Sequence, residues 1–167
     1  MSKKHIPEET VYAFIDSQNL NKGVKNQGWK LDFKKFRVYL REKYKVTKCY
    51  LFIGYIPKYR SLYAQLKNSS YLVVFKPTLK IRRLCVIKGN VDAELVLHTM
   101  IELKNFDKAI IISGDGDFHC LLKYLDSINK LGFLIIPNSA EYSSLLRKFR
   151  NKTIFISSEE KSRLEEK

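Results

Sequence analysis

Four aspartates of this sequence stand where short apolar runs end or where a helix is expected to begin. Asp16 follows the apolar run 11–15, Asp115 and Asp117 follow the run 109–112, and Asp92 stands at the start of a helix expected over 91–104. Carboxylates that converge raise each other's pKa, and a hard divalent cation such as Mg²⁺ or Mn²⁺ removes that cost through its preference for oxygen ligands. Such an ion can polarise a phosphodiester and lower the pKa of an attacking water. These aspartates are therefore candidates for one metal site with hydrolytic chemistry.

Each of these aspartates also has a simpler interpretation. A lone aspartate after a strand is most often a turn former or a helix N-cap, and that interpretation stays open for Asp16 and Asp117. The segment Gly114-Asp115-Gly116-Asp117 is typical of any tight turn, and it lacks the regular spacing of a calcium loop. The coincidence of three acid-tipped segments at one expected sheet edge is what favours the metal site.

Strands and helices are expected to alternate along the chain. The apolar patterns predict strands at 11–15, 47–55, 71–75, 109–112, 133–136 and 153–156, and helices at 31–44, 58–66, 91–104, 118–130 and 141–149. The polar stretch 17–30 is expected to be a long loop, and 82–87 a hairpin arm or an edge strand. This alternation predicts an α/β fold with a doubly wound, mainly parallel sheet and helices on both faces. Ligands bind beyond the carboxyl ends of the strands in such a sheet, so the four aspartates meet if the strands at 11–15 and 109–112 are neighbours.

The charge of the chain points to a polyanionic partner. There are 31 Lys and Arg residues against 17 Asp and Glu residues, a formal net charge of +14, and no acidic residue stands between Lys43 and Val91. Such an excess attracts nucleic acids and speeds their encounter with the protein. Tyrosines are interleaved with these basic residues, and they either stack on unpaired bases or pack in the core: Tyr44, Tyr55, Tyr59, Tyr63 and Tyr71.

The 167 residues fit one domain, expected over 11–156, with a flexible segment at 1–10 and a charged tail at 157–167, for which a frayed helix is an alternative. No run of 18 apolar residues and no signal peptide is visible, so we expect a cytoplasmic protein that does not span a membrane. The cysteines, Cys49, Cys85 and Cys120, are far apart and form no CxxC pair. They are expected to be buried free thiols rather than zinc ligands.

Three segments of the chain resemble the signature motifs of a known family. FIDSQNL at 14–20, KGNVDAEL at 88–95 and ISGDGDF at 112–118 resemble, in family order, the motifs of the NYN domain, also called LabA-like. The resemblance covers about 11–156. It implies a PIN-like (Rossmannoid) nuclease fold, an acidic pocket that binds Mg²⁺ or Mn²⁺, and cleavage of RNA.

The resemblance also implies roles for individual residues. The acidic positions of the family, which bind metal and take part in catalysis, correspond to Asp16, Asp92, Asp115 and Asp117. Asn19 corresponds to a polar residue that orients a ligand or water. Ser113 corresponds to a small hydroxyl residue beside the site, and Lys88 to a basic residue near a phosphate; both are expected to contact substrate.

The chain departs from the family pattern at two positions. Ser17 stands where many members have glycine, and His98 stands where many carry a further aspartate six residues after Asp92. A histidine there could ligate Mn²⁺, carry a proton near the substrate, or simply pack as a helix residue. All three roles of His98 stay open.

The leading hypothesis is therefore a metal-dependent endoribonuclease whose basic residues, including Arg82 and Arg83, hold the RNA backbone. The alternative is a non-catalytic RNA-binding module with a retained PIN-like fold, which the histidine at 98 favours. A nucleotide-binding or phosphatase-like enzyme is less favoured, because no glycine-rich phosphate loop follows the strand at 11–15. DNA is not excluded as substrate, and the family resemblance alone suggests a homodimer.

Overall fold

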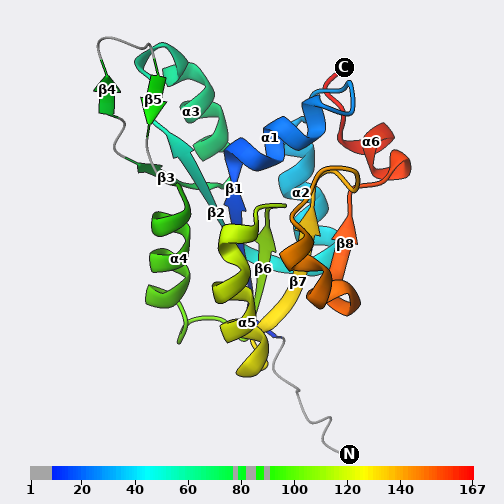
Figure 1. Ribbon diagram of the computed structural model, residues 1–167. Helices are drawn as coiled ribbons and strands as arrows, with labels where there is room; N and C mark the ends of the chain where they lie inside the picture. Colours follow the sequence, from blue (N-terminus) through cyan, green and yellow to red (C-terminus); the bar gives the residue numbers. More distant parts are fainter. Residues whose placement is uncertain (1–8, 77–78, 82–85, 89–90) are drawn as a thin grey trace, which may run out of the picture.

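A parallel sheet forms the centre of the computed structural model, which describes residues 9–76, 79–81, 86–88 and 91–167 (Figure 1). The strands of this sheet are β1 (Val11–Asp16), β2 (Val46–Gly54), β3 (Leu72–Lys76), β6 (Lys108–Ile112), β7 (Leu131–Ile136) and β8 (Thr153–Phe155). Their spatial order is β3-β2-β1-β6-β7-β8, and all neighbouring pairs are parallel. Two short strands, β4 (Leu79–Ile81) and β5 (Val86–Lys88), pair antiparallel in a separate hairpin, where the sequence predicts a hairpin arm.

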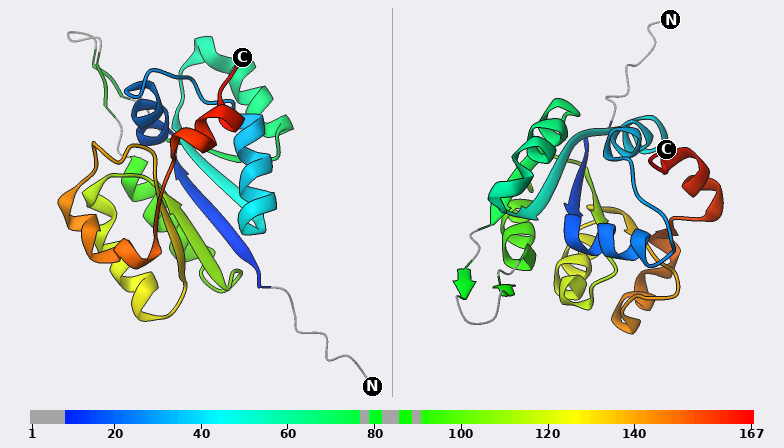
Figure 2. Two further views of the ribbon diagram at one scale, coloured as in Figure 1. Left: turned by 90° about the vertical axis from the view of Figure 1, so that its right-hand side faces the viewer. Right: turned by 90° about the horizontal axis from the view of Figure 1, so that it is seen from above.

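Helices connect the strands and cover both faces of the sheet (Figure 2). The α-helices are α1 (Ser17–Lys25), α2 (Phe33–Tyr44), α3 (Arg60–Asn68), α4 (Val91–Ile101), α5 (His119–Ser127) and α6 (Ser158–Leu164). The 3₁₀ segments are η1 (Pro57–Tyr59), η2 (Gly116–Phe118) and η3 (Ser144–Lys152). The predicted α/β fold with a doubly wound parallel sheet is thus confirmed.

The core has two halves, one on each face of the sheet. Sheet residues such as Ile15 and Leu51 pack against α1, α2, α3 and α6 on one face. Their neighbours along the same strands, such as Phe14 and Phe52, pack against α4, α5 and η3 on the other face. Side chains alternate between the two faces of a strand, so strands that are buried on both sides need continuous apolar runs. This requirement explains the runs that identify β1, β6 and β7 in the sequence.

The direction of strand addition reverses at the centre of the sheet, between β1 and β6. The chain builds outward through β2 and β3 on one side, and through β7 and β8 on the other. The loops that leave the carboxyl ends of β1 and β6 therefore turn to opposite faces, and a crevice opens between them. Asp16 ends β1, and Ser113 follows β6 directly.

Residues 17–30 are not the long loop that the sequence predicts, because most of them form α1. Asp16 caps this helix by accepting a hydrogen bond from the Asn19 amide, and Leu20 and Val24 are fully buried one turn apart. Gly23 lies so close to the loop after β7 that a Cβ atom there would come within 2.8 Å of the Pro137 Cβ. Tertiary packing thus stabilises a helix whose polar, glycine-containing sequence has weak intrinsic propensity.

The end of the chain also differs in detail from the prediction. The helix predicted at 141–149 is a 3₁₀ segment, η3, which begins later than predicted, after its cap Ser143, and ends at Lys152. Residues 157–167 contain α6, whose Ser157 and Glu160 form a capping box and whose Leu164 is buried.

The cysteines are only partly as predicted. Cys49 is buried as predicted, whereas Cys120 is exposed, so the prediction of a buried thiol there is wrong; Cys85 lies outside the described residues. Within the described part of the chain, no helix is long and apolar enough to cross a membrane.

Candidate active site

Asp16 is the last residue of β1, at the carboxyl edge of the sheet. It is only 4% exposed. Its Oδ1 accepts a hydrogen bond from the Asn19 amide at 3.1 Å, and its Oδ2 accepts one from the Ser113 hydroxyl at 3.2 Å. Burial raises the pKa of the Asp16 carboxyl, and the nearby charge of Asp115 raises it further, against the lowering effect of these hydrogen bonds. The two hydrogen bonds therefore fix the position of the Asp16 carboxylate, but they do not fully offset the cost of burying its negative charge.

The loop after β6 carries the next two acids in a chain of local hydrogen bonds. The Asp115 amide donates to the Ser113 hydroxyl at 3.1 Å, and the Asp117 amide donates to Asp115 Oδ1 at 3.0 Å. Asp115 is the N-cap of η2, and Asp117 is exposed within it. The capping role that the sequence leaves open thus belongs to Asp16 and Asp115, not to Asp117.

Asn19 and Ser113 hold the two loops of the site together. The Asn19 Oδ1 accepts a hydrogen bond from the Gly114 amide at 2.8 Å, which ties the first turn of α1 to the loop after β6. Ser113 is 1% exposed and contacts both Asp16 and Asp115 through its hydroxyl. Its hydroxyl thus links the two acids, and the substrate contact that the sequence predicts for Ser113 stays a prediction.

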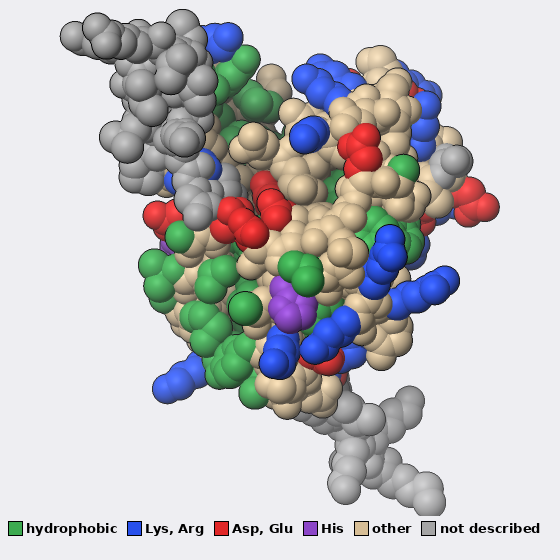
Figure 3. Space-filling model, viewed as in Figure 1, with side chains coloured by type: hydrophobic (Ala, Val, Ile, Leu, Met, Phe, Trp, Pro, Cys, Tyr) green, Lys and Arg blue, Asp and Glu red, His purple; other side chains and the backbone are tan. Residues whose placement is uncertain are grey.

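Asp92 reaches the same site from α4, which packs on the face of the sheet opposite α1. It is half-buried, and burial raises the pKa of its carboxyl. The charges of Asp115, Asp16 and Asp117, in that order of effect, raise this pKa further, while Lys76 lowers it. The four predicted aspartates therefore share one electrostatic environment. Acidic side chains gather in the middle of the face shown in Figure 3, with basic side chains above and below them.

Lys76 is a residue of the site that sequence reasoning missed. It is the last residue of β3 and only 7% exposed. Phe75 packs with Tyr55 and Tyr63 on one face of the sheet, and Val74 on the other, so alternation places Lys76 on the α4 face with Asp92. Burial lowers the pKa of the Lys76 ammonium, and the charges of Asp92 and Asp16 oppose this shift. The signal was its place at a strand end, the same signal that identified the aspartates.

The donor set suits a hard cation, although no ligand cage is preformed. Among the described residues, no group of three or more His, Cys, Asp or Glu side chains is close enough to hold a metal ion. The available donors are carboxylate oxygens, and burial together with repulsion between the aspartates raises the pKa of Asp16 and Asp92. Mg²⁺ keeps several of its waters and needs only one or two carboxylates, so these residues fit it without a closed cage.

Four other predicted site residues are not seen among the acids. His98 packs against the rings of Tyr50 and Phe52, with centroid distances of 6.4 and 5.6 Å. It lies about 9 Å along α4 from Asp92, at a rise of ~1.5 Å per residue, and thus occupies the packed helix position that the sequence leaves open. Arg82 and Arg83 lie outside the described residues, and only the backbone of Lys88, in β5, is described.

Most of the interleaved tyrosines contribute to packing. Tyr63 and Tyr71 are buried, and Tyr44 and Tyr55 are half-buried against other rings. Tyr59 is exposed, and the Lys58 Nζ lies 4.9 Å from the centroid of its ring. Stacking on unpaired bases therefore remains available to Tyr59 within this set, and not to the two buried tyrosines.

A scan against protein-family models matches the NYN domain over residues 10–159. The chain belongs to the NYN domain family. NYN domains are part of the PIN-like superfamily and are generally nucleases, which agrees with acids gathered at the carboxyl edge of a parallel sheet. The LabA-like assignment stays a prediction.

A similar fold is seen in a solved structure. The crystal structure of a protein of unknown function from Vibrio parahaemolyticus is 22% identical in sequence and superimposes with a TM-score of 0.74, covering 95% of this chain and 98% of that one. This likeness supports the fold. A search of curated proteins finds no significant match.

Proposed function

We propose that this NYN domain is a metal-dependent endoribonuclease that hydrolyses RNA phosphodiesters with Mg²⁺ or Mn²⁺. One observation supports this most strongly: carboxylates from three distant segments gather at one edge of the sheet, where burial first, and then the charges of neighbouring aspartates, raise the pKa of Asp16 and Asp92. Repulsion of this kind costs stability unless a cation offsets it. The positive charge of Lys76 offsets part of this repulsion at Asp92, and a divalent ion would offset the remainder.

The residues divide the work by their burial and contacts. Asp16 and Asp115 are held by Ser113, and Asp92 approaches them from α4; one or two of these three would hold the ion directly, and the others would hold it through its waters. Asp117 is exposed and would contact it through water. When bound, the ion would act as a Lewis acid that polarises the phosphodiester and favours deprotonation of the attacking water.

Lys76 and Asn19 have distinct roles in this proposal. The Lys76 ammonium lies on the α4 face beside Asp92 and would attract a non-bridging phosphate oxygen. Asn19 keeps the β1 and β6 loops at a fixed separation through its bond to Gly114. Fixed positions lower the cost of reorganisation during the reaction.

Basic residues would hold the RNA backbone outside the acids. The net charge of +14 supports a polyanionic substrate, and Arg147, Lys148 and Arg150 of η3 are exposed. Arg82, Arg83 and Lys88 are further candidates from the sequence. Phosphate contacts of this kind give affinity that falls steeply with salt.

The test is cleavage of a labelled single-stranded RNA with Mn²⁺ by wild type, Asp16→Asn and the control Asp126→Asn. Asp126 lies on α5, where it pairs with Lys152 at 2.7 Å. We expect Asp16→Asn to lose at least about 100-fold in rate, since metal affinity depends on each ligand and its partners. Asp126→Asn should cleave like wild type. Equal cleavage by all three proteins would refute the proposal.

A second candidate is an RNA-binding module without turnover. The observation that favours it is the lack of a preformed three-ligand group among the described acidic, histidine and cysteine side chains. This candidate predicts salt-dependent RNA binding with no cleavage in Mn²⁺, and binding that Asp16→Asn leaves unchanged.

A further inference from the structure

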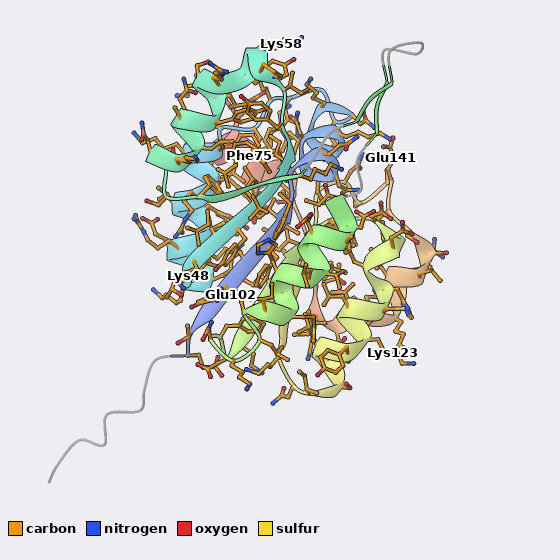
Figure 4. All side chains as sticks on the ribbon, turned by 90° about the vertical axis from the view of Figure 1, so that its left-hand side faces the viewer. Lys48, Lys58, Phe75, Glu102, Lys123 and Glu141 are labelled. Atoms are coloured by element: carbon orange, nitrogen blue, oxygen red, sulfur yellow. The ribbon has the colours of Figure 1, made fainter. Side chains whose placement is uncertain are left out.

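A shallow hollow of about 410 Å³ opens directly beside the acids. Its walls come from the acid loop and from the segment that leads into η3: Asn19, Gly114, Asp115, Gly116, Asp117, Glu141, Tyr142, Ser143 and Leu145. Figure 4 labels Glu141 near the carboxyl edge of the sheet, whereas Lys48 and Glu102 lie toward the opposite edge. The hollow and the acidic site thus share Asp115 and Asp117.

The walls of the hollow combine an aromatic ring and an aliphatic side chain with a polar rim. Tyr142 is half-buried and its ring packs on Phe155, with centroids 5.5 Å apart. Leu145 is 57% exposed at the opening. Asn19, Ser143 and Glu141 supply hydrogen-bonding atoms around them. A nucleobase has this same combination, with apolar π faces and a polar edge.

Hydrogen bonds and close contacts hold the walls of the hollow in place. The Ser143 amide donates to the Gly114 carbonyl oxygen at 3.0 Å, and Asn26 Nδ2 donates to Glu141 Oε2 at 2.6 Å. A Cβ atom at position 114 would lie 3.2 Å from the Tyr142 Cβ. Because these walls are already ordered, a ligand does not have to overcome the entropic cost of ordering them, and it can bind through fewer contacts.

From this geometry we propose that the hollow binds one unpaired nucleobase next to the scissile phosphate, so that the site acts on single-stranded nucleic acid. The inference rests on the proposed function for the position of the phosphate. A base in a duplex has both faces stacked and its edge paired, so it cannot reach Tyr142 and Leu145 without leaving the helix. The volume lies within the ~300–1,000 Å³ of ordinary small-ligand sites.

The experiment measures binding of short oligonucleotides that carry 2-aminopurine, whose fluorescence changes when the base stacks. Single-stranded RNA, the same RNA in a duplex and single-stranded DNA are compared. All proteins carry Asp16→Asn, which prevents turnover under the proposed function. The test variants are Tyr142→Leu and Leu145→Ala. The matched control is Leu97→Ala, a leucine of α4 that is 55% exposed away from the hollow.

We expect single-stranded RNA to bind with a fluorescence change and the duplex to bind without one. Tyr142→Leu should weaken binding roughly 5- to 150-fold, the range found when an aromatic stacking partner is removed. Leu145→Ala should weaken it about 3-fold, and Leu97→Ala should bind like the parent. Single-stranded DNA that binds equally well would extend the base site to both nucleic acids. Melting temperatures of the variants show whether any loss comes from unfolding.

The base site and the nuclease assignment fail in different ways. Fluorescence changes of equal size in parent, Tyr142→Leu and Leu145→Ala would overturn the base site, even if wild type cleaves RNA in Mn²⁺. No cleavage by wild type, together with a fluorescence change that Tyr142→Leu removes, would overturn the nuclease and leave the base site standing.

Discussion

Replacing Gly116 with alanine should push the two walls of the active-site region apart. A Cβ atom at position 116 would lie 2.3 Å from the Ser143 Oγ, 2.9 Å from the Ser143 Cβ and 3.3 Å from the Leu145 Cδ1. Gly116 lies in η2 and is not among the described glycines with positive φ, so the backbone itself accepts alanine. The cost therefore comes from the contact with Ser143.

The expected size follows from the behaviour of overpacked sites. Forcing a methyl group into a packed contact destabilises proteins by about 1–3 kcal/mol. For a domain of this size each kcal/mol lowers the melting temperature by about 2–4 °C, so Gly116→Ala should melt roughly 2–12 °C below wild type. Urea unfolding followed by circular dichroism measures the change in the free energy of unfolding.

A double-mutant cycle with Ser143→Gly tests the cause. Ser143→Gly removes both of the closest atoms, although it also removes the hydroxyl that caps η3 through the Leu145 amide at 3.4 Å. Replacement of a cap by glycine costs only a few tenths of a kcal/mol. The double variant should therefore be more stable than Gly116→Ala alone. If the destabilisation of the double variant equals the sum of the two single-variant destabilisations within about 0.5 kcal/mol, the contact with Ser143 is not the cause.

Three further perturbations probe the site and the core. In metal-free buffer, Asp16→Asn should become more stable relative to wild type as the pH rises above 3.8. Burial and the charge of Asp115 raise the pKa of the Asp16 carboxyl, so its ionisation costs the folded wild type free energy. A difference in the free energy of unfolding between the two proteins that is constant from pH 4 to pH 7 would contradict this. Lys76→Met should bind Mn²⁺ several-fold more tightly in calorimetry, since a positive charge that competes with the ion is lost, yet it should cleave RNA more slowly. Lys76→Arg keeps the charge and should bind Mn²⁺ and cleave RNA like wild type. Alkylation in native buffer followed by peptide mapping should show Cys120 modified and Cys49 unmodified, because Cys49 is buried and burial raises the pKa of its thiol to about 12. Equal labelling of the two cysteines would contradict their placement.

The sheet could be predicted from the sequence because its strands are buried on both faces. Ile110, Ile111 and Ile112 face alternate halves of the core, so the run has no polar interruption. The helix α1 could not be predicted in this way. Its two buried apolar side chains, Leu20 and Val24, stand among polar residues, and what stabilises the helix is contact with segments distant in sequence.

The acids of the site could be predicted because they follow strands directly. The topology that places β1 beside β6 turns sequence positions almost 100 residues apart into neighbours. The segment 141–145 shows the limit of this reasoning. Gly114 and Gly116 mark a turn in the sequence, but nothing local shows that their missing side chains make room for Tyr142 and Ser143.

The most direct test of the shared metal site is anomalous diffraction from crystals soaked in Mn²⁺. We predict one manganese peak or a close pair in the crevice between β1 and β6, with Asp16, Asp92 and Asp115 as nearest carboxylates. Crystals of Asp16→Asn under the same conditions should show a much weaker peak. Full occupancy of manganese elsewhere, with none beside these aspartates, would contradict the account.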